Sequence, residues 1–401
     1  MQRSGVADLR LHPGRAPSWL LNRMKRMADA LFVVMVDEHG TTECLRRLGD
    51  PLWFQALSNV LGYDWDSSGS TTVTCGVLRS VLQSSRHGLV ATGGKGARSR
   101  RVPKDLQALG DQLGFGEPLT QTLIYASRMT AKVDSAALQD GHQLYHHAFF
   151  LDTENGRWTV VQQGMNAETG TSRRYHWVSE DLADFIEEPH SGIITQRRCA
   201  FVLDMTARAS RGSRQTSVAL ACEESPARLR NLFYDYKPPS HDVSLLKWSD
   251  SPSIPQQRLN AKAASIPLHR LFPDHMDWDA VRRVYDVQPR NFEELLAVRG
   301  VGPATIRGLA LLSDMCYGEA PSWEDPVRMT FAFGGKDGVP FPVNRKAYDE
   351  AIAFLNDAVD RAKLDQKARL DAFRRLRHCL PIRSAPLEEL STVRETSRGF
   401  D

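Results

Sequence analysis

The sequence lacks any long apolar run. Its longest, residues Leu31–Val36, is far below the roughly 20 residues that a membrane-spanning helix needs. The first residues also lack the pattern of a signal peptide, in which a basic stretch precedes an apolar one. We therefore expect a cytoplasmic protein without a membrane partner.

The sequence also has little net charge and no closely spaced cysteines. With 51 basic and 48 acidic residues, the formal net charge is only +3, so any anion-binding surface must come from local clusters of Lys and Arg. The spacing of the cysteines excludes a zinc knuckle and a thioredoxin-like pair, and predicts reduced thiols at Cys44, Cys75, Cys199, Cys222, Cys316 and Cys379.

The residue patterns predict an α+β fold. Apolar residues at helical spacing, together with capping signals, predict helices over residues 17–37, 50–62, 104–113, 119–132 and 218–234. Strands are predicted at 89–92, 147–151, 158–161 and within 193–203. Asn155-Gly156 lies between the second and third of these strands and indicates a β-hairpin.

Composition divides the 401 residues into two predicted domains. A mixed α/β catalytic domain over residues 1–236 precedes a proline- and serine-rich linker over 237–267. An all-helical domain over 268–380 and a polar tail over 381–401 follow. The helical domain contains the clearest motif of the chain.

That motif is a helix-hairpin-helix pattern at residues 291–313. A short helix is followed by Arg299-Gly-Val-Gly302 and by a second helix with Pro303 in its first turn. Gly300 and Gly302 permit a tight turn whose amides, at a helix N-terminus, can bind a backbone phosphate without reading base sequence, while Val301 can point inward. The predicted contacts at this motif are Arg299, Gly300, Val301, Gly302, Ala304, Thr305 and Arg307; a plain helical turn is the alternative.

The motif resembles the helix-hairpin-helix superfamily of repair enzymes, nucleases and polymerases. In its base-excision glycosylases an essential Asp follows the hairpin by about two dozen residues, and Asp325 stands at about that place. The lyase lysine of that branch would fall near Ala304 and is absent, which leaves a monofunctional glycosylase. Pro326 departs from the glycosylase pattern, and we favour a capping role for Asp325.

Several further segments together resemble an uncharacterised bacterial and archaeal family catalogued as domain of unknown function 763. The resemblance extends from Arg3 to about Lys363 and implies no particular activity. The segments that carry it are Arg3–Leu9, Gly14–Pro17, Asp50–Gln55, Gly93–Gly96, Ala131–Asp134, Leu138–Gly141, Tyr145–His147, Val161–Asn166, Arg173–Trp177 and Phe333–Gly338.

The densest group of chemically able side chains lies between residues 132 and 176. Carboxylates and imidazoles can hold Mn²⁺ or Mg²⁺, and the cation can activate water for attack on a phosphodiester. We predict metal ligation by Asp134, Asp140 and one of His146 and His147, which would point to opposite faces of a strand. The predicted catalytic residues are Lys132, Asp134, Asp140, His146, His147, Gln163, Arg174 and His176, each weighed against a purely structural role.

Two glycine-rich loops are further candidates for phosphate contact. The first, Gly93–Arg101, is basic and contributes Lys95, Arg98 and Arg100; it weakly resembles the phosphate-contacting loop of ParB-like and sulfiredoxin-like folds. The second, Gly334–Gly338, contributes Lys336. A solvated charged loop and a plain turn are the respective alternatives.

Taken together, the sequence predicts a metal-dependent deoxyribonuclease of DNA repair or processing. Its expected substrate is single-stranded or branched DNA, with RNA as an alternative, and a homodimer and a repair helicase are left open as partners. A non-enzymatic DNA-binding or scaffold protein is the second hypothesis, and a glycosylase acting through Asp325 is the third.

Overall fold

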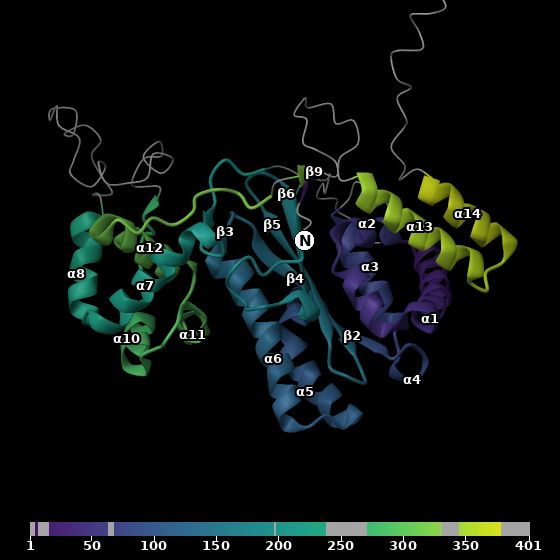
Figure 1. Ribbon diagram of the computed structural model, residues 1–401, viewed down its shortest axis with the longest axis horizontal. Helices are drawn as coiled ribbons and strands as arrows, with labels where there is room; N and C mark the ends of the chain where they lie inside the picture. Colours follow the sequence, from purple (N-terminus) through teal and green to yellow (C-terminus); the bar gives the residue numbers. More distant parts are fainter. Residues whose placement is uncertain are drawn as a thin grey trace, which may run out of the picture.

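A central β-sheet lies between two layers of helices in the computed structural model of this chain (Figure 1). The structure describes residues 5–6, 16–62, 68–195, 198–237, 271–327, 329–330 and 345–377. Within these residues the sheet has the strand order β2-β4-β5-β6-β7-β1-β9. The mixed α and β class predicted from the sequence is confirmed.

Five strands of this sheet are antiparallel neighbours, and two short parallel strands extend one edge. The turn at Asn155-Gly156 joins β4 to β5 as predicted, and Gly156 has a φ of +72°. The strands are β1 (Gly5–Val6), β2 (Leu89–Lys95), β4 (Gln143–Asp152), β5 (Trp158–Asn166), β6 (Thr171–Val178), β7 (Gly192–Thr195) and β9 (Met329–Thr330), with β3 (Leu138–Gln139) and β8 (Leu203–Asp204) paired separately.

One face of the sheet is covered by helices from both ends of the chain. Alternation along the strands places Ala148, Phe150 and Val161 on this face, where they pack against apolar residues of the helices. Asp50 caps α2 by accepting from the amide of Leu52 at 2.9 Å. The helices of this layer are α1 (Ser18–Leu48), α2 (Pro51–Leu61), α3 (Gly69–Val81), α4 (Ser84–His87), α13 (Arg345–Arg361) and α14 (Gln366–Arg377).

The opposite face packs on a larger group of helices. Phe149, Leu151 and Trp177 belong to this second core. The elements of this layer are η1 (Gly96–Arg101), α5 (Val102–Leu113), α6 (Glu117–Lys132), η2 (Val133–Ala137), α7 (Arg211–Glu223), α8 (Pro226–Tyr236), α10 (Trp278–Val287), α11 (Phe292–Ala297) and α12 (Pro303–Tyr317), and two short 3-10 turns, η3 (Ser179–Asp181) and η4 (Arg208–Ser210), lie in connecting loops.

The two cores do not follow the domain division that composition predicts. Apolar residues of α10, α11 and α12 share one core with α5, α6 and the sheet. Helices α13 and α14, assigned by sequence to the same helical domain, pack instead with α1 and α2 (Figure 1). Composition and periodicity can be read from the sequence, but long-range packing decides which of the two apolar layers a helix joins. Residues 238–267 and 381–401 lie outside the described residues.

None of the described helices is both long and apolar enough to cross a membrane.

Candidate nucleic-acid interface

Two helices joined by a tight turn carry the residues predicted to bind phosphate. Asn291 caps α11 by accepting a hydrogen bond from the amide of Glu294 at 2.9 Å. The turn that follows, residues 298–302, has Gly300 at a φ of +93°, a conformation that favours glycine. Pro303 then opens α12, where the missing N–H costs no helical hydrogen bond. We call residues 298–302 the α11–α12 turn.

The α11–α12 turn presents its backbone outward and one side chain inward. Val301 is fully buried in the core, whereas Gly300 is exposed. Gly302 occupies the N-cap position of α12 but has no side chain to accept from the first-turn amides, which include those of Ala304 and Thr305. A helix N-terminus without a side-chain cap favours a nearby anion, through its amides and through the helix dipole.

The two arginines predicted beside this turn differ in what they can do. Arg299 is exposed, and its backbone carbonyl accepts from Nε of Arg283 at 2.8 Å. Arg307 is half-buried and donates from Nε to Oε1 of Gln139 at 2.8 Å, and burial lowers its pKa. The side chain of Arg299 is therefore available to a phosphate. The side chain of Arg307 is already used in the hydrogen bond that attaches α12 to Gln139.

Lys132, predicted to be catalytic, is instead bonded to the α11–α12 turn. Its ammonium group donates to the carbonyl oxygen of Val301, and burial lowers its pKa. Gln139 adds a second attachment, because its amide nitrogen donates to the carbonyls of Ala136 and Pro303, each at 2.8 Å. The segment after α6 and the turn, more than 160 residues apart in sequence, thus form one continuous region.

Helix α6 contributes a basic residue that the sequence analysis missed. Tyr125 donates to a carboxylate oxygen of Glu293 on α11 at 2.6 Å, and Lys132 reaches the turn. Arg128 lies between them on the same helical stripe and is exposed. The spacing of Tyr125, Arg128 and Lys132 was visible in the sequence, but only the docking of α11 shows which stripe of α6 faces it.

Asp134, a predicted metal ligand, is buried and already has protein donors. It accepts from His190 at 2.5 Å, from the Gln162 amide at 2.6 Å and from the Trp177 indole at 3.0 Å. Burial raises the pKa of Asp134, and the hydrogen bonds and nearby charge of His190 oppose that rise. His190 had no motif around it and was not predicted.

Asp140 and Asp325 hold the two sides of one buried arginine, Arg173. The guanidinium lies 3.1 Å from a carboxylate oxygen of Asp140 and 2.6 Å from one of Asp325. Burial alone would raise the pKa of Asp140, but the charge of Arg173 and hydrogen bonds from His142 and Tyr175 lower it to about 2. Asp325 also accepts from the amide of Val327 at 3.0 Å and caps a loop, not a helix. Its engagement with Arg173 gives no support to the glycosylase hypothesis.

His146 and His147 point to opposite faces of β4. His147 bonds to Ser127 at 3.0 Å and to Gln162 at 2.8 Å on the α6 side of the sheet. Burial lowers its pKa to about 4. His146 lies on the other face, toward α2 and α3, in register with Gln163 of β5. The two histidines therefore cannot ligate one ion together.

Gln163, Arg174 and His176 also lie on the face toward α2 and α3. Arg174 donates from Nε to Nε2 of His176 at 2.9 Å, and Nδ1 of His176 contacts the carbonyl of Leu48 at 3.0 Å. Burial lowers the pKa of His176 well below its ordinary value. Both ring nitrogens are used in this way, so His176 has no free nitrogen for acid–base catalysis.

The basic loop predicted at residues 93–101 is exposed at the edge of the sheet. It forms the end of β2 and the 3-10 turn η1. Lys95, Arg98 and Arg100 are exposed, as phosphate contact would require. Gly93 has a φ of +90°, and a Cβ there would lie 2.1 Å from the carbonyl oxygen of His147, which explains the glycine. The second loop and Lys336 lie outside the described residues.

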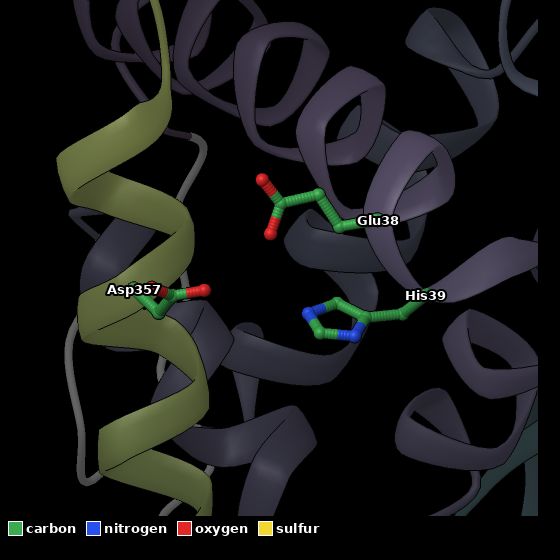
Figure 2. A group of neighbouring side chains, drawn as sticks. All are labelled: Glu38, His39 and Asp357. Atoms are coloured by element: carbon green, nitrogen blue, oxygen red, sulfur yellow. The ribbon is translucent and has the colours of Figure 1, made fainter.

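The structure does not assemble the predicted metal site. Among the described residues, the group whose ligand atoms could meet at one ion, all within 4.8 Å of one another, is Glu38, His39 and Asp357. Figure 2 shows these side chains pointing into the space between α1 and α13. Arg361 binds Glu38 and also lies 3.1 Å from Asp357, so a cation there would compete with a guanidinium. The predicted set of Asp134, Asp140 and one histidine is not brought together, because Asp140 is paired with Arg173 and His146 lies on the face opposite Asp134.

A family model described as a protein of unknown function (DUF763) matches residues 5–343, well over half of the chain. The chain belongs to this family. No match was found among curated proteins or among solved structures. Membership of the DUF763 family names no activity.

Proposed function

We propose that this protein binds DNA through the sugar-phosphate backbone at the α11–α12 turn, which we interpret as a helix-hairpin-helix element. The observation that carries the proposal is the partly exposed N-terminus of α12, which has no side-chain cap and lies beside the exposed Arg299. A phosphate there would accept from backbone amides and gain from the helix dipole. Arg128 on the neighbouring stripe of α6 would add a second cationic contact.

The proposed function is DNA binding and does not include cleavage. Metal-dependent cleavage was predicted from Asp134, Asp140 and one of His146 and His147, all of which are buried. Asp134 and His147 both bond to Gln162, Asp140 pairs with Arg173, and His146 lies on the other face of the sheet. Buried carboxylates with protein donors are poor ligands for a substrate-facing ion, because the ion would have to displace those donors. Incubation of the same DNA with Mn²⁺ and with Mg²⁺ tests for cleavage, and cleavage that persists in Asp134→Asn and Asp140→Asn would show that the chemistry lies elsewhere in the chain.

The test is fluorescence anisotropy with end-labelled single-stranded, duplex and branched DNA over a range of salt concentrations. Arg299→Glu should weaken binding to every sequence and reduce the dependence of log K on log salt by about 0.7 to 0.9, the loss of one phosphate contact. Arg26→Glu, an exposed arginine on α1, is the matched control. Equal affinities and salt slopes for the two variants would refute the proposed interface.

A further inference from the structure

A row of polar side chains crosses the sheet on the face covered by α2 and α3. Lys95 of β2 is in register with His146 of β4, His146 with Gln163 of β5, and Gln163 with Arg174 of β6. Residues directly opposite on antiparallel strands share a face, with Cβ atoms about 4.5–5.5 Å apart. Lys95 is exposed, and the other three are buried to 1% exposure or less.

Arg174 is a buried cation without a carboxylate among the described residues. It donates to His176, to Gln55 at 3.1 Å, to Thr71 at 3.2 Å and to the carbonyl of Pro51 at 3.3 Å, which uses four of its five N–H groups. All four acceptors are neutral. The chain neighbour Arg173, on the other face of β6, shows the contrast, because two carboxylates flank it.

Other groups of the row have hydrogen-bonding capacity without a partner among the described residues. Both ring nitrogens of His146 and Oε1 of Gln163 are buried and unpaired, as is the hydroxyl of Ser70 beside Thr71. Burial, together with the nearby His147, Lys95 and Arg174, lowers the pKa of His146 to about 3, so its ring is neutral and offers one donor and one acceptor. Unpaired buried polar groups, and still more an uncompensated charge, are costly to retain.

We propose that this face of the sheet binds a phosphate group among His146, Gln163 and Arg174. The anion would neutralise Arg174 and accept from its fifth N–H and from the ring N–H of His146. A hydrogen phosphate also carries an O–H, which can donate to Oε1 of Gln163. Sulfate has the same shape but no such proton, so the row should select phosphate over sulfate.

The outer end of the row has the charge expected of an entrance for an anion. Lys95 is exposed there, and Arg98 follows it in η1. Arg79 at the end of α3 is half-buried; burial and the charge of Arg98 lower its pKa. Three cations therefore lie around the exposed end of a row that leads to Arg174.

The test measures thermal unfolding of the full chain in sodium phosphate, sulfate and chloride at matched ionic strength. Binding to the folded state raises the midpoint with ligand concentration and saturates, which separates it from the general salting effect that sulfate also produces. The expected result is a saturable increase in phosphate beyond that in sulfate. Equal increases in the two salts, or none, would overturn the proposal.

Arg174→Met is the decisive variant. Replacing a buried unpaired charge by an apolar side chain of similar length is tolerated and often stabilising, so this variant should fold in chloride. Its response to phosphate should be at least about tenfold weaker, the loss of a charge-assisted hydrogen bond. Arg208→Met removes an exposed arginine and should keep the wild-type response. If Arg174→Met responds as wild type does, the site is not at Arg174.

The source of the phosphate is resolved by three probes, namely inorganic phosphate, a nucleoside monophosphate, and an oligonucleotide with or without a 5′-phosphate. Stabilisation by any of them that depends on Arg174 supports the site, and its rank order shows whether a free anion or a phosphate ester is preferred. Arg299→Glu should leave the responses to inorganic phosphate and to the nucleoside monophosphate unchanged, and should lower only the part of the oligonucleotide response that comes from the DNA interface. The phosphate site and the DNA interface can therefore fail independently.

Discussion

The ammonium group of Lys132 donates a hydrogen bond to the carbonyl oxygen of Val301, joining the last residue of α6 to the turn that precedes α12. Val301 is the buried residue of that turn, so its carbonyl is fixed by the same packing that exposes Gly300. Lys132 thus links the sheet-covering helix α6 with the segment proposed to hold a phosphate, and its role is positioning.

Lys132→Met should loosen the α11–α12 turn. The variant keeps much of the buried stem but removes the donor to Val301, and we expect a loss of about 1 kcal/mol in the free energy of unfolding. Hydrogen exchange at residues 298–306 should become faster, and DNA affinity should fall at all salt concentrations. Lys104→Met, an exposed lysine on α5, is the control. Unchanged exchange in the turn would show that packing alone positions it.

Arg128→Ala should separate phosphate contact from positioning. Arg128 is exposed on the stripe of α6 between Tyr125 and Lys132, so its loss should barely change stability. If it contacts DNA, the salt dependence of binding should decrease by about 0.7 to 0.9 in log K per log salt, as for one lost phosphate. Arg26→Ala serves as the matched control. A normal salt slope for Arg128→Ala would exclude α6 from the interface.

Asp325→Asn should destabilise the fold, because Arg173 and its two carboxylates are buried. Removing one partner of such a network costs about 3–5 kcal/mol. Glu180→Gln provides the comparison: the exposed Glu180 pairs with the exposed Arg157 at 3.0 Å, and exposed pairs contribute about 1 kcal/mol or less. Urea unfolding measures both. A loss for Asp325→Asn no greater than for Glu180→Gln would contradict the structural role assigned to Asp325.

Local signals in the sequence predicted much of the secondary structure. The Asp50-Pro51 start and Gly62 end of α2, and the Asn155-Gly156 turn, depend on a few adjacent residues, and the structure has them at those positions. Strand β6 was not predicted as a strand, because it contains Arg173 and Arg174, whose burial needs partners from distant segments. The density of polar residues there was interpreted as an active site.

The candidate sites show the same division between local and long-range information. The turn around Gly300 follows from its own residues, and the sequence located it. Asp134 and His146 are close in sequence, but the sheet separates them, since strand alternation and the helices on each face decide which side chains meet. The contacts of Arg173 with Asp325 and of Lys132 with Val301 join segments more than 150 residues apart, which no local pattern predicts.

His147 should make the stability of the protein depend on pH. Burial lowers its pKa to about 4, whereas an unfolded histidine titrates near 6.5. Between these values the unfolded chain binds more protons at this residue, so its contribution to stability is fully present above about pH 6.5 and is lost as the pH falls toward 4. Where the unfolded chain binds one proton more than the folded protein at this residue, the free energy of unfolding changes by about 1.4 kcal/mol per pH unit.

His147→Gln removes this contribution while keeping a side chain that can bond to Ser127 or Gln162. The free energy of unfolding, measured in urea at pH 7, 6 and 5, should fall less steeply with decreasing pH than in the wild type. The difference in slope should approach one proton at pH 5, because there the folded ring is still neutral and the unfolded one is charged. His275→Gln, an exposed histidine, should keep the wild-type slope. If the free energy of unfolding of His147→Gln has the same pH slope as that of the wild type, His147 does not stay neutral in the folded protein, and the prediction is wrong.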